Sequence, residues 1–471
     1  MWLSRAVAWI VCVSLALPGV AVSGEKQSLP QPLPKTVAVA AFKNGLAFVV
    51  RQGAVQLQSG MGRIAPIPNA TLGTLWLAPG EANTMLDEVV AYRYAALRED
   101  PNTHEKAAEV RSALRFKING ANDRTDLTLG YLEHGLGWTP SYMISLNDDK
   151  TAQITMQAVV MDDAEDLDNT EVFFVVGAPN FAYSETPSPM GLQQNLLSFM
   201  KDAGRRDEES YKRFSNAIAG QMVMSEYKEF DAAGAPTFAQ TVSELTGAPE
   251  EDLFLYSRPG VTLERGERGT YNVFTTTVGY EHIYEWEVVD AQRVDAYGNV
   301  IQNNPSAPDA ATRNSVWHSI QLKNATKFPW TSAPAMVISG IKPVSQDTLP
   351  YTPKGANSKL RVTIATDIRS SHDEREIVRQ QNVQRRHGYE YDLVTVEGSL
   401  KLKNYKTKEV RVDVGKTLRG EVEVQSDEGK AIKLGEAIQA DNPLSRLSWK
   451  IALKPGEERV VTYRYKIFVR A

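Results

Sequence analysis

The stretch Gly135-Leu136-Gly137-Trp138-Thr139-Pro140-Ser141-Tyr142 lies between two segments, Leu127–Leu132 and Met143–Leu146, that both have the composition of strands. Apolar and polar residues alternate in the first segment, as they do along a strand with one face in a core. The quoted stretch is therefore expected to lead the chain into a strand.

Two glycines and a proline shape the entry into this strand. Gly135 and Gly137 carry no side chain, so they suit a tight bend or the close approach of a second backbone. Pro140 has a fixed φ and no N–H to donate, which favours the edge or the start of a strand over the inside of a ladder.

Trp138 and Tyr142 are the large rings of the stretch. Such rings are more often buried than exposed in strand-rich domains, so we expect them to anchor a core. The alternative is an exposed aromatic platform for a sugar or a peptide.

The whole chain has the texture of a mainly β protein built from antiparallel β-sandwich domains. It has 471 residues, of which 42% are hydrophobic and 23% charged, and this composition is ordinary for a globular protein of two or three domains. Short strands follow one another without regular strand–helix alternation, which favours sandwiches over a parallel sheet. We expect a small N-terminal β domain over 36–106 and one or more β-sandwich domains of unknown function over 107–471.

The texture changes near residues 184–250. This segment has several prolines and glycines, and its charged middle has spaced apolar residues. The pattern favours short amphipathic helices or a mobile excursion over strands. We therefore expect a partly helical insertion between two strands of one sandwich.

The N-terminus predicts export to the periplasm or the extracellular space. Residues 1–23 combine Arg5, an apolar run and the small-residue cleavage site Ala21-Val22-Ser23, which is the pattern of a signal peptide. The apolar run is short for a membrane span, so an uncleaved anchor is the lesser alternative. Residues 24–35 have three prolines and predict an extended linker.

The only cysteine, Cys12, lies inside this signal segment. The mature chain would therefore have no disulfide, no thiolate zinc site and no cysteine nucleophile. The net charge of −5 argues against a nucleic-acid partner, which usually requires a basic excess. No later segment has the length of a membrane helix, so no integral membrane span is expected after signal removal.

Histidines and carboxylates give no clear metal or catalytic motif. The six histidines are not at ligand spacing in the sequence. His282 shares a strand face with Tyr284 and Trp286, which favours a packed, hydrogen-bonded side chain over a ligand. The run His372-Asp373-Glu374-Arg375-Glu376 has mixed charges and is interpreted as a solvated turn or short helix. The basic cluster Arg375–Arg386 is interpreted as mixed surface.

The acidic run Asp162-Asp163-Ala164-Glu165-Asp166-Leu167-Asp168-Asn169 is the best candidate for a cation site. Its carboxylates lie at alternate positions, as calcium ligands often do, but it lacks the glycine and the terminal glutamate of a helix-loop-helix site. A solvated turn is the default interpretation, and a cation role stays open.

Nucleophile, phosphate-loop and dinucleotide motifs are not found in the sequence. Glu281, Glu285 and Glu287 lie on one face of a strand, where they could supply the paired carboxylates of a glycosidase. A solvent-facing polar edge explains them more simply. We therefore assign no catalytic, cofactor-binding or metal residue and expect no cofactor.

Several segments carry a family resemblance, which begins with the Gly-Trp-Thr-Pro-Ser-Tyr core and the acidic turn. The others are Ile154–Val160, Phe173–Asn180, Asp252–Tyr256, Leu322–Thr326 and Leu453–Glu457. Together they resemble the bacterial mucoidy-inhibitor-type family, whose C-terminal domain has no known function. The resemblance covers most of the chain after about Ala107 and implies a fold without catalytic residues. Family members often carry a long coiled coil before this domain, and its heptads are not found here.

These observations predict an exported, non-enzymatic envelope or secreted binding protein, with an envelope protein or glycan as its partner. A carbohydrate- or peptide-active hydrolase with dispersed carboxylates is the alternative. It would need a cleft with two acidic side chains about 5–10 Å apart. A structural partner of an export or polysaccharide system is a third, weaker hypothesis.

Overall fold

The computed structural model describes residues 29–99, 106–177, 179–192, 249–250, 253–289, 292–302, 314–386, 388–434 and 440–471. These residues are nearly all strand, and most strand pairs are antiparallel, so the predicted mainly β fold is confirmed. The expected signal peptide lies outside the described residues. No helix in the described part of the chain is long and apolar enough to cross a membrane.

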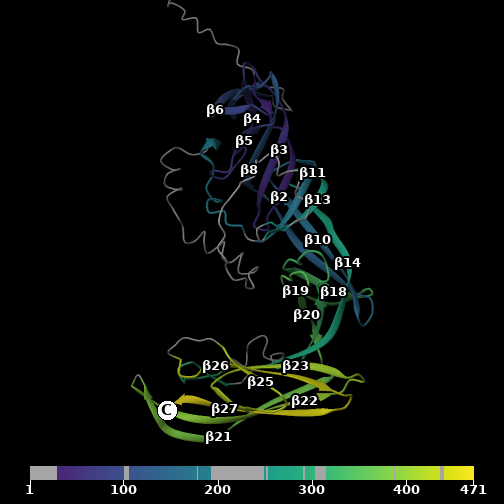
Figure 1. Ribbon diagram of the computed structural model, residues 1–471, viewed down its shortest axis with the longest axis vertical. Helices are drawn as coiled ribbons and strands as arrows, with labels where there is room; N and C mark the ends of the chain where they lie inside the picture. Colours follow the sequence, from purple (N-terminus) through teal and green to yellow (C-terminus); the bar gives the residue numbers. More distant parts are fainter. Residues whose placement is uncertain are drawn as a thin grey trace, which may run out of the picture.

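A seven-stranded sheet forms one layer of the central sandwich (Figure 1). In spatial order its strands are β12 (Pro249–Glu250), β13 (Leu253–Leu263), β11 (Leu167–Val176), β2 (Lys35–Ala41), β3 (Leu46–Gln56), β8 (Arg124–His134) and β5 (Trp76–Pro79). The strands β2 and β3 belong to the predicted first domain, yet they pair with β11 and β8. One sheet therefore continues across the expected boundary near residue 106.

A four-stranded sheet packs at the N-terminal end of this layer. Its order is β1 (Gln31–Pro32), β4 (Met61–Ala65), β7 (Lys106–Asn119) and β6 (Met85–Glu99). Residues 86–97 lie in β6. A separate core that includes Ile64, Phe116 and Leu127 joins this sheet to β8.

The largest sheet has ten strands and continues into the C-terminal part of the molecule. Its path is β19 (Lys342–Leu349), β18 (Ala333–Ser339), β9 (Leu136–Leu146), β10 (Thr151–Asp162), β14 (Arg268–Val288), β23 (Val410–Arg419), β26 (Leu444–Leu453) and β25 (Lys430–Lys433). Off this path, β17 (Trp317–Lys323) pairs with β14, and β20 (Asn357–Ile364) pairs with β17. The first half of β14 pairs with β10, and its last residues pair with β23.

The C-terminal sandwich forms when β23, β25 and β26 face a second four-stranded sheet (Figure 1). The order of this second sheet is β21 (Ile368–Arg386), β22 (Tyr389–Asn404), β27 (Glu458–Arg470) and β24 (Glu421–Gln425). The short hairpin β15 (Gln292–Val294) and β16 (Val300–Gln302) lies in the connection after β14. Trp286, Trp449 and Tyr463 are buried in the core of this sandwich.

The stretch 135–142, which the sequence predicted as the entry to a strand, forms the first part of β9 itself, because β9 begins at Leu136. Trp138 is fully buried, its ring lies 5.2 Å from that of Phe174, and its indole N–H donates to the carbonyl of Val175. A Cβ on Gly137 would lie 2.8 Å from Gly45 Cα, so only glycine fits this close backbone approach. The prediction that Trp138 anchors a core is confirmed.

Pro140 lies within β9 and not at its end. It pairs with Ala158 on one side, while β18 joins the other edge of β9 only from Tyr142 onward. The proline therefore occupies a part of the strand that β18 does not reach, which is where a residue without an N–H is tolerated.

Most of the predicted insertion, residues 193–248, lies outside the described residues. Of its ends, Pro189–Gly191 forms a single 3-10 turn, η1, and Pro249–Glu250 forms β12. The partly helical character expected for 184–250 is not seen in the part that the structure describes.

Candidate functional site

The acidic run Asp162–Asn169 connects β10 to β11, and the simple picture of a solvated turn is wrong for half of it. Asp162 is fully buried and Glu165 is only 6% exposed. The burial alternates because the two residues turn toward the sandwich while Asp163 and Asp166 face solvent.

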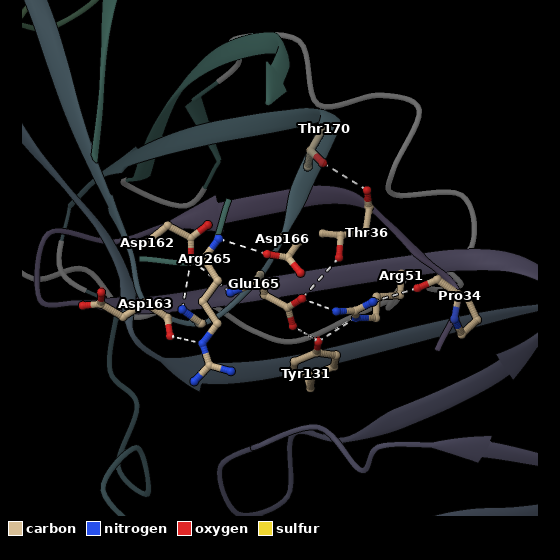
Figure 2. Close-up of polar contacts among 11 residues, drawn as sticks. Pro34, Thr36, Arg51, Tyr131, Asp162, Asp163, Glu165, Asp166, Thr170 and Arg265 are labelled. Carbon is tan, nitrogen blue, oxygen red and sulfur yellow. Dashed lines mark hydrogen bonds and ion pairs between the residues drawn. The ribbon is translucent and has the colours of Figure 1, made fainter. Parts of the chain in front are cut away.

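Glu165 forms a buried ion pair instead of an open cation site (Figure 2). Its carboxylate binds the guanidinium of Arg51 and accepts a hydrogen bond from the Tyr131 hydroxyl. The Arg51 Nε donates to Tyr131 at 2.9 Å, and its Nη1 donates to the carbonyl of Pro34 at 2.8 Å. The turn is therefore held against β3 and β8 by hydrogen bonds among Glu165, Arg51 and Tyr131.

The remaining carboxylates of the run are also engaged. Asp162 accepts hydrogen bonds from the backbone N–H groups of Ala164 and Glu165, each at 3.0 Å. Asp163 pairs with Arg268, and Asp166 accepts from the backbone of Arg265. Among the described residues, no group of three or more His, Cys, Asp or Glu side chains is arranged to hold a metal ion.

Glu133 lies beside this network and is only 4% exposed. Burial and the neighbouring negative charge of Glu165 raise its pKa to about 9. The Glu133 carboxyl is therefore protonated at neutral pH and can share its proton with Glu165. Because it is buried against an ion pair, we interpret this group as part of the protein's stability and not as a catalytic acid.

Two histidines that are far apart in the sequence meet on the surface. The pairing of β14 with β17 brings His282 Nδ1 to 2.8 Å from His318 Nε2. His282 is hydrogen-bonded, as expected, but it is exposed and not packed into a core. Burial and the charge of His282 lower the pKa of His318 to about 4. Sequence spacing could not reveal this pair, because 36 residues separate its members.

Glu285 and Glu287 lie on a polar face of the sheet and not at its edge, because β14 pairs with β17 on one side and with β23 on the other. Glu285 accepts hydrogen bonds from Lys359 and Ser319, both at 2.7 Å. Glu287 pairs with Arg446 at 2.6 Å. These carboxylates are engaged in cross-strand contacts on the face of β14 opposite the buried Trp286.

The interpretation of 372–376 as a solvated turn or short helix is wrong. The run lies within β21, where side chains alternate between the two faces of the sheet. His372 and Glu374 are half-buried, whereas Asp373, Arg375 and Glu376 are exposed. The sequence did not predict this strand, because its half-buried positions carry polar side chains in place of the apolar ones that mark a strand face.

Glu374 is held by a row of residues across three adjacent strands. Glu374 pairs with Gly398, and Gly398 pairs with Tyr463. A Cβ on Gly398 would lie 2.1 Å from the Tyr463 ring, so only glycine lets the ring lie across the middle strand. The Tyr463 hydroxyl then donates to Glu374 Oε1 at 2.6 Å.

His372 and Lys416 complete this polar cluster, which we call the buried tetrad: His372, Glu374, Lys416 and Tyr463. His372 Nε2 lies 2.9 Å from the Tyr463 hydroxyl. A phenol has one proton to donate, and Tyr463 gives it to Glu374, so His372 must donate from Nε2. Lys416 comes from the facing sheet and is fully buried.

The ammonium of Lys416 lies 3.3 Å from Glu374 Oε1 and 5.5 Å from the centre of the Tyr463 ring. Burial alone would raise the pKa of Glu374, but the hydrogen bonds from His372 and Tyr463 and the charge of Lys416 hold it at about 2. Glu374 is therefore ionised at all physiological pH values.

A cavity of about 500 Å³ opens between the two sheets next to the tetrad. Polar and apolar atoms contribute about equally to its surface. The apolar side chains of its lining are Val288, Val289, Val294, Val300, Val394, Val396, Leu418, Leu444, Tyr465, Ile467 and Val469. The charged residues of its lining are Glu287, Glu374, Glu376, Arg375, Arg379 and Arg419. Small-molecule sites are usually concave and combine apolar side chains with fixed polar groups, and this cavity has both.

The charges around the cavity are largely neutralised within the protein. Arg379 pairs with Glu376 at 2.7 Å and with Asp392 at 2.8 Å, and Arg375 pairs with Glu397. This lining therefore suits a ligand without a strong net charge.

Comparisons with known proteins do not assign this chain to a family. No protein-family model matches this chain, and no curated protein matches it. The resemblance to the mucoidy-inhibitor-type family accordingly stays a prediction.

Proposed function

We propose that this protein is an exported, non-enzymatic binding protein whose C-terminal sandwich takes an amphipathic small molecule. The ligand would have an apolar chain and an uncharged or zwitterionic polar end. The single observation that carries the proposal is the cavity of about 500 Å³, whose lining has eleven apolar residues together with three acidic and three basic ones. Its volume lies within the range of known small-molecule sites.

The apolar wall supplies the affinity in this proposal. Val394, Leu418 and Ile467 come from both sheets of the sandwich. An apolar ligand chain between them would therefore be removed from water on both of its sides, which favours binding. The buried tetrad fixes one end of the wall. Because Glu374 and Lys416 neutralise each other there, a full charge on the ligand would find no free counter-ion at this end.

The signal peptide predicted at residues 1–23 and the resemblance to the bacterial mucoidy-inhibitor-type family support a role outside the cytoplasm, and both remain part of the proposal. An envelope protein or glycan partner stays a prediction. A role as a structural partner of an export or polysaccharide system also remains a prediction.

The hydrolase alternative is weaker at this cavity. Its general acid would need a raised pKa. Glu374 has a pKa of about 2, and the ion pair with Arg379 lowers the pKa of Glu376. Glu133, whose pKa is raised, is buried in the central sandwich.

Binding of a neutral apolar fluorophore, N-phenyl-1-naphthylamine, tests the proposal. We expect saturable binding that dodecanol displaces at lower concentration than dodecylamine or dodecanoate does. Val396→Trp places a large ring in the cavity wall and should weaken binding about tenfold. Val460→Trp, at an exposed position of β27, is the matched control. Equal binding by wild type and Val396→Trp would refute the cavity as the site.

A further inference from the structure

A second cluster of polar and aromatic side chains, separate from the cavity, lies on β14 and β17 between the cores of the central and C-terminal sandwiches. Along one face of β14, Tyr280 belongs to the central core and Trp286 to the C-terminal core. His282 and Tyr284 lie between them on the same face. His318 on β17 joins them there through the antiparallel pairing of the two strands.

We propose that His282 and His318 form a binding site for a divalent transition metal ion that prefers square-planar nitrogen ligation, with Cu(II) as the best fit. Their facing nitrogens, Nδ1 of His282 and Nε2 of His318, are 2.8 Å apart. Two ligands at a right angle with bonds of about 2.0 Å are separated by about 2.8 Å, which matches Cu(II) or Ni(II). Tetrahedral zinc would need about 3.3 Å.

The rings are held ready for this role. The Tyr284 ring stacks on His318 and the Tyr280 ring meets the edge of His282, each with centroids 5.1 Å apart. The hydrogen bond between the two rings requires one unprotonated nitrogen, so a ring lone pair is already present at the site. Ligation would replace the present N–H···N hydrogen bond. The proton of the donating ring moves to its other nitrogen, so no net proton is released.

The surrounding charges do not oppose a cation strongly. The two nearby lysines are each paired with a carboxylate: Lys408 with Asp149 at 2.9 Å, and Lys406 with Asp367 at 3.6 Å. Water would occupy the remaining positions on the metal, since the site has two protein ligands.

Titration of the purified protein, without an affinity tag, with CuCl₂ tests the site by calorimetry and electron paramagnetic resonance. We expect one Cu(II) per chain with nitrogen hyperfine coupling, and weaker binding of ZnCl₂. His282→Gln and His318→Gln should each weaken Cu(II) binding at least tenfold. His134→Gln, at an exposed histidine elsewhere, should leave it unchanged.

Unchanged Cu(II) affinity in both His282→Gln and His318→Gln would overturn the site. Tighter binding of zinc than of copper would overturn the square-planar assignment. Thermal unfolding of each variant without metal separates a loss of ligands from a loss of fold.

Discussion

Lys416 reaches across the C-terminal sandwich to Glu374, with 3.3 Å between Nζ and Oε1, and no part of Lys416 is exposed to solvent. The two residues lie on facing sheets, so this ion pair connects the layers at the end of the cavity. A fully buried ammonium is costly unless a carboxylate compensates it. The pair therefore fixes how the two sheets face each other.

Loss of Lys416 should destabilise the protein strongly. Lys416→Met leaves Glu374 with an uncompensated charge, and we expect a loss of about 3–5 kcal/mol of unfolding free energy. Urea unfolding measures it. Lys450→Met, at an exposed position of β26, is the control and should change stability by less than about 0.5 kcal/mol. Adding Glu374→Gln to Lys416→Met should recover part of the loss.

A side chain at Gly398 should disrupt the same cluster from the other side. In Gly398→Ala the new methyl group would clash with the Tyr463 ring, 2.1 Å away, and displace its hydroxyl from Glu374. We expect a loss of roughly 1–3 kcal/mol, measured by thermal or urea unfolding. Gly279→Ala is the comparison, because its Cβ would meet no atom closer than 4.0 Å. Similar losses in both variants would contradict the close packing of ring on glycine.

Glu133 should make stability depend on pH. Its pKa is raised in the folded protein to about 9 from an ordinary value of 4.5. The stabilisation by its bound proton is therefore complete below pH 4.5 and is lost as the pH rises through 9. The difference in unfolding free energy between wild type and Glu133→Gln isolates this group from others that titrate.

Relative to Glu133→Gln, the wild type should lose stability from pH 6.5 to pH 9, by at most about 1.4 kcal/mol per pH unit. Urea unfolding of both proteins at several pH values measures this difference. A difference that stays constant over this range would show that Glu133 is not protonated in the folded protein.

Trp138 should be the largest single contributor among the residues of the stretch around β9. Because it is fully buried against Phe174, Trp138→Ala should cost about 3–5 kcal/mol. The matched variant Trp76→Ala removes a ring that is 67% exposed and should cost far less. Denaturant unfolding compares the two, and equal losses would contradict the assignment of Trp138 to the core.

Much of the fold follows from local sequence pattern. The alternation in 127–132 predicts that Leu127 and Leu129 face a core, and both are fully buried in β8. The glycines before Trp138 predict a close backbone approach, which occurs at Gly137. These features depend only on a strand's period of two and on the size of a side chain, so neighbouring residues are enough to predict them.

The sites depend on pairings that no local pattern contains. His282 meets His318, Glu165 meets Arg51, and Lys416 meets Glu374 only because strands from distant parts of the chain pair or face each other. The sequence by itself determined a strand-rich chain with buried rings, and its first residues predict export. The tertiary structure alone decided which polar residues became neighbours, because strand register and sheet stacking are set by the packing of the whole chain.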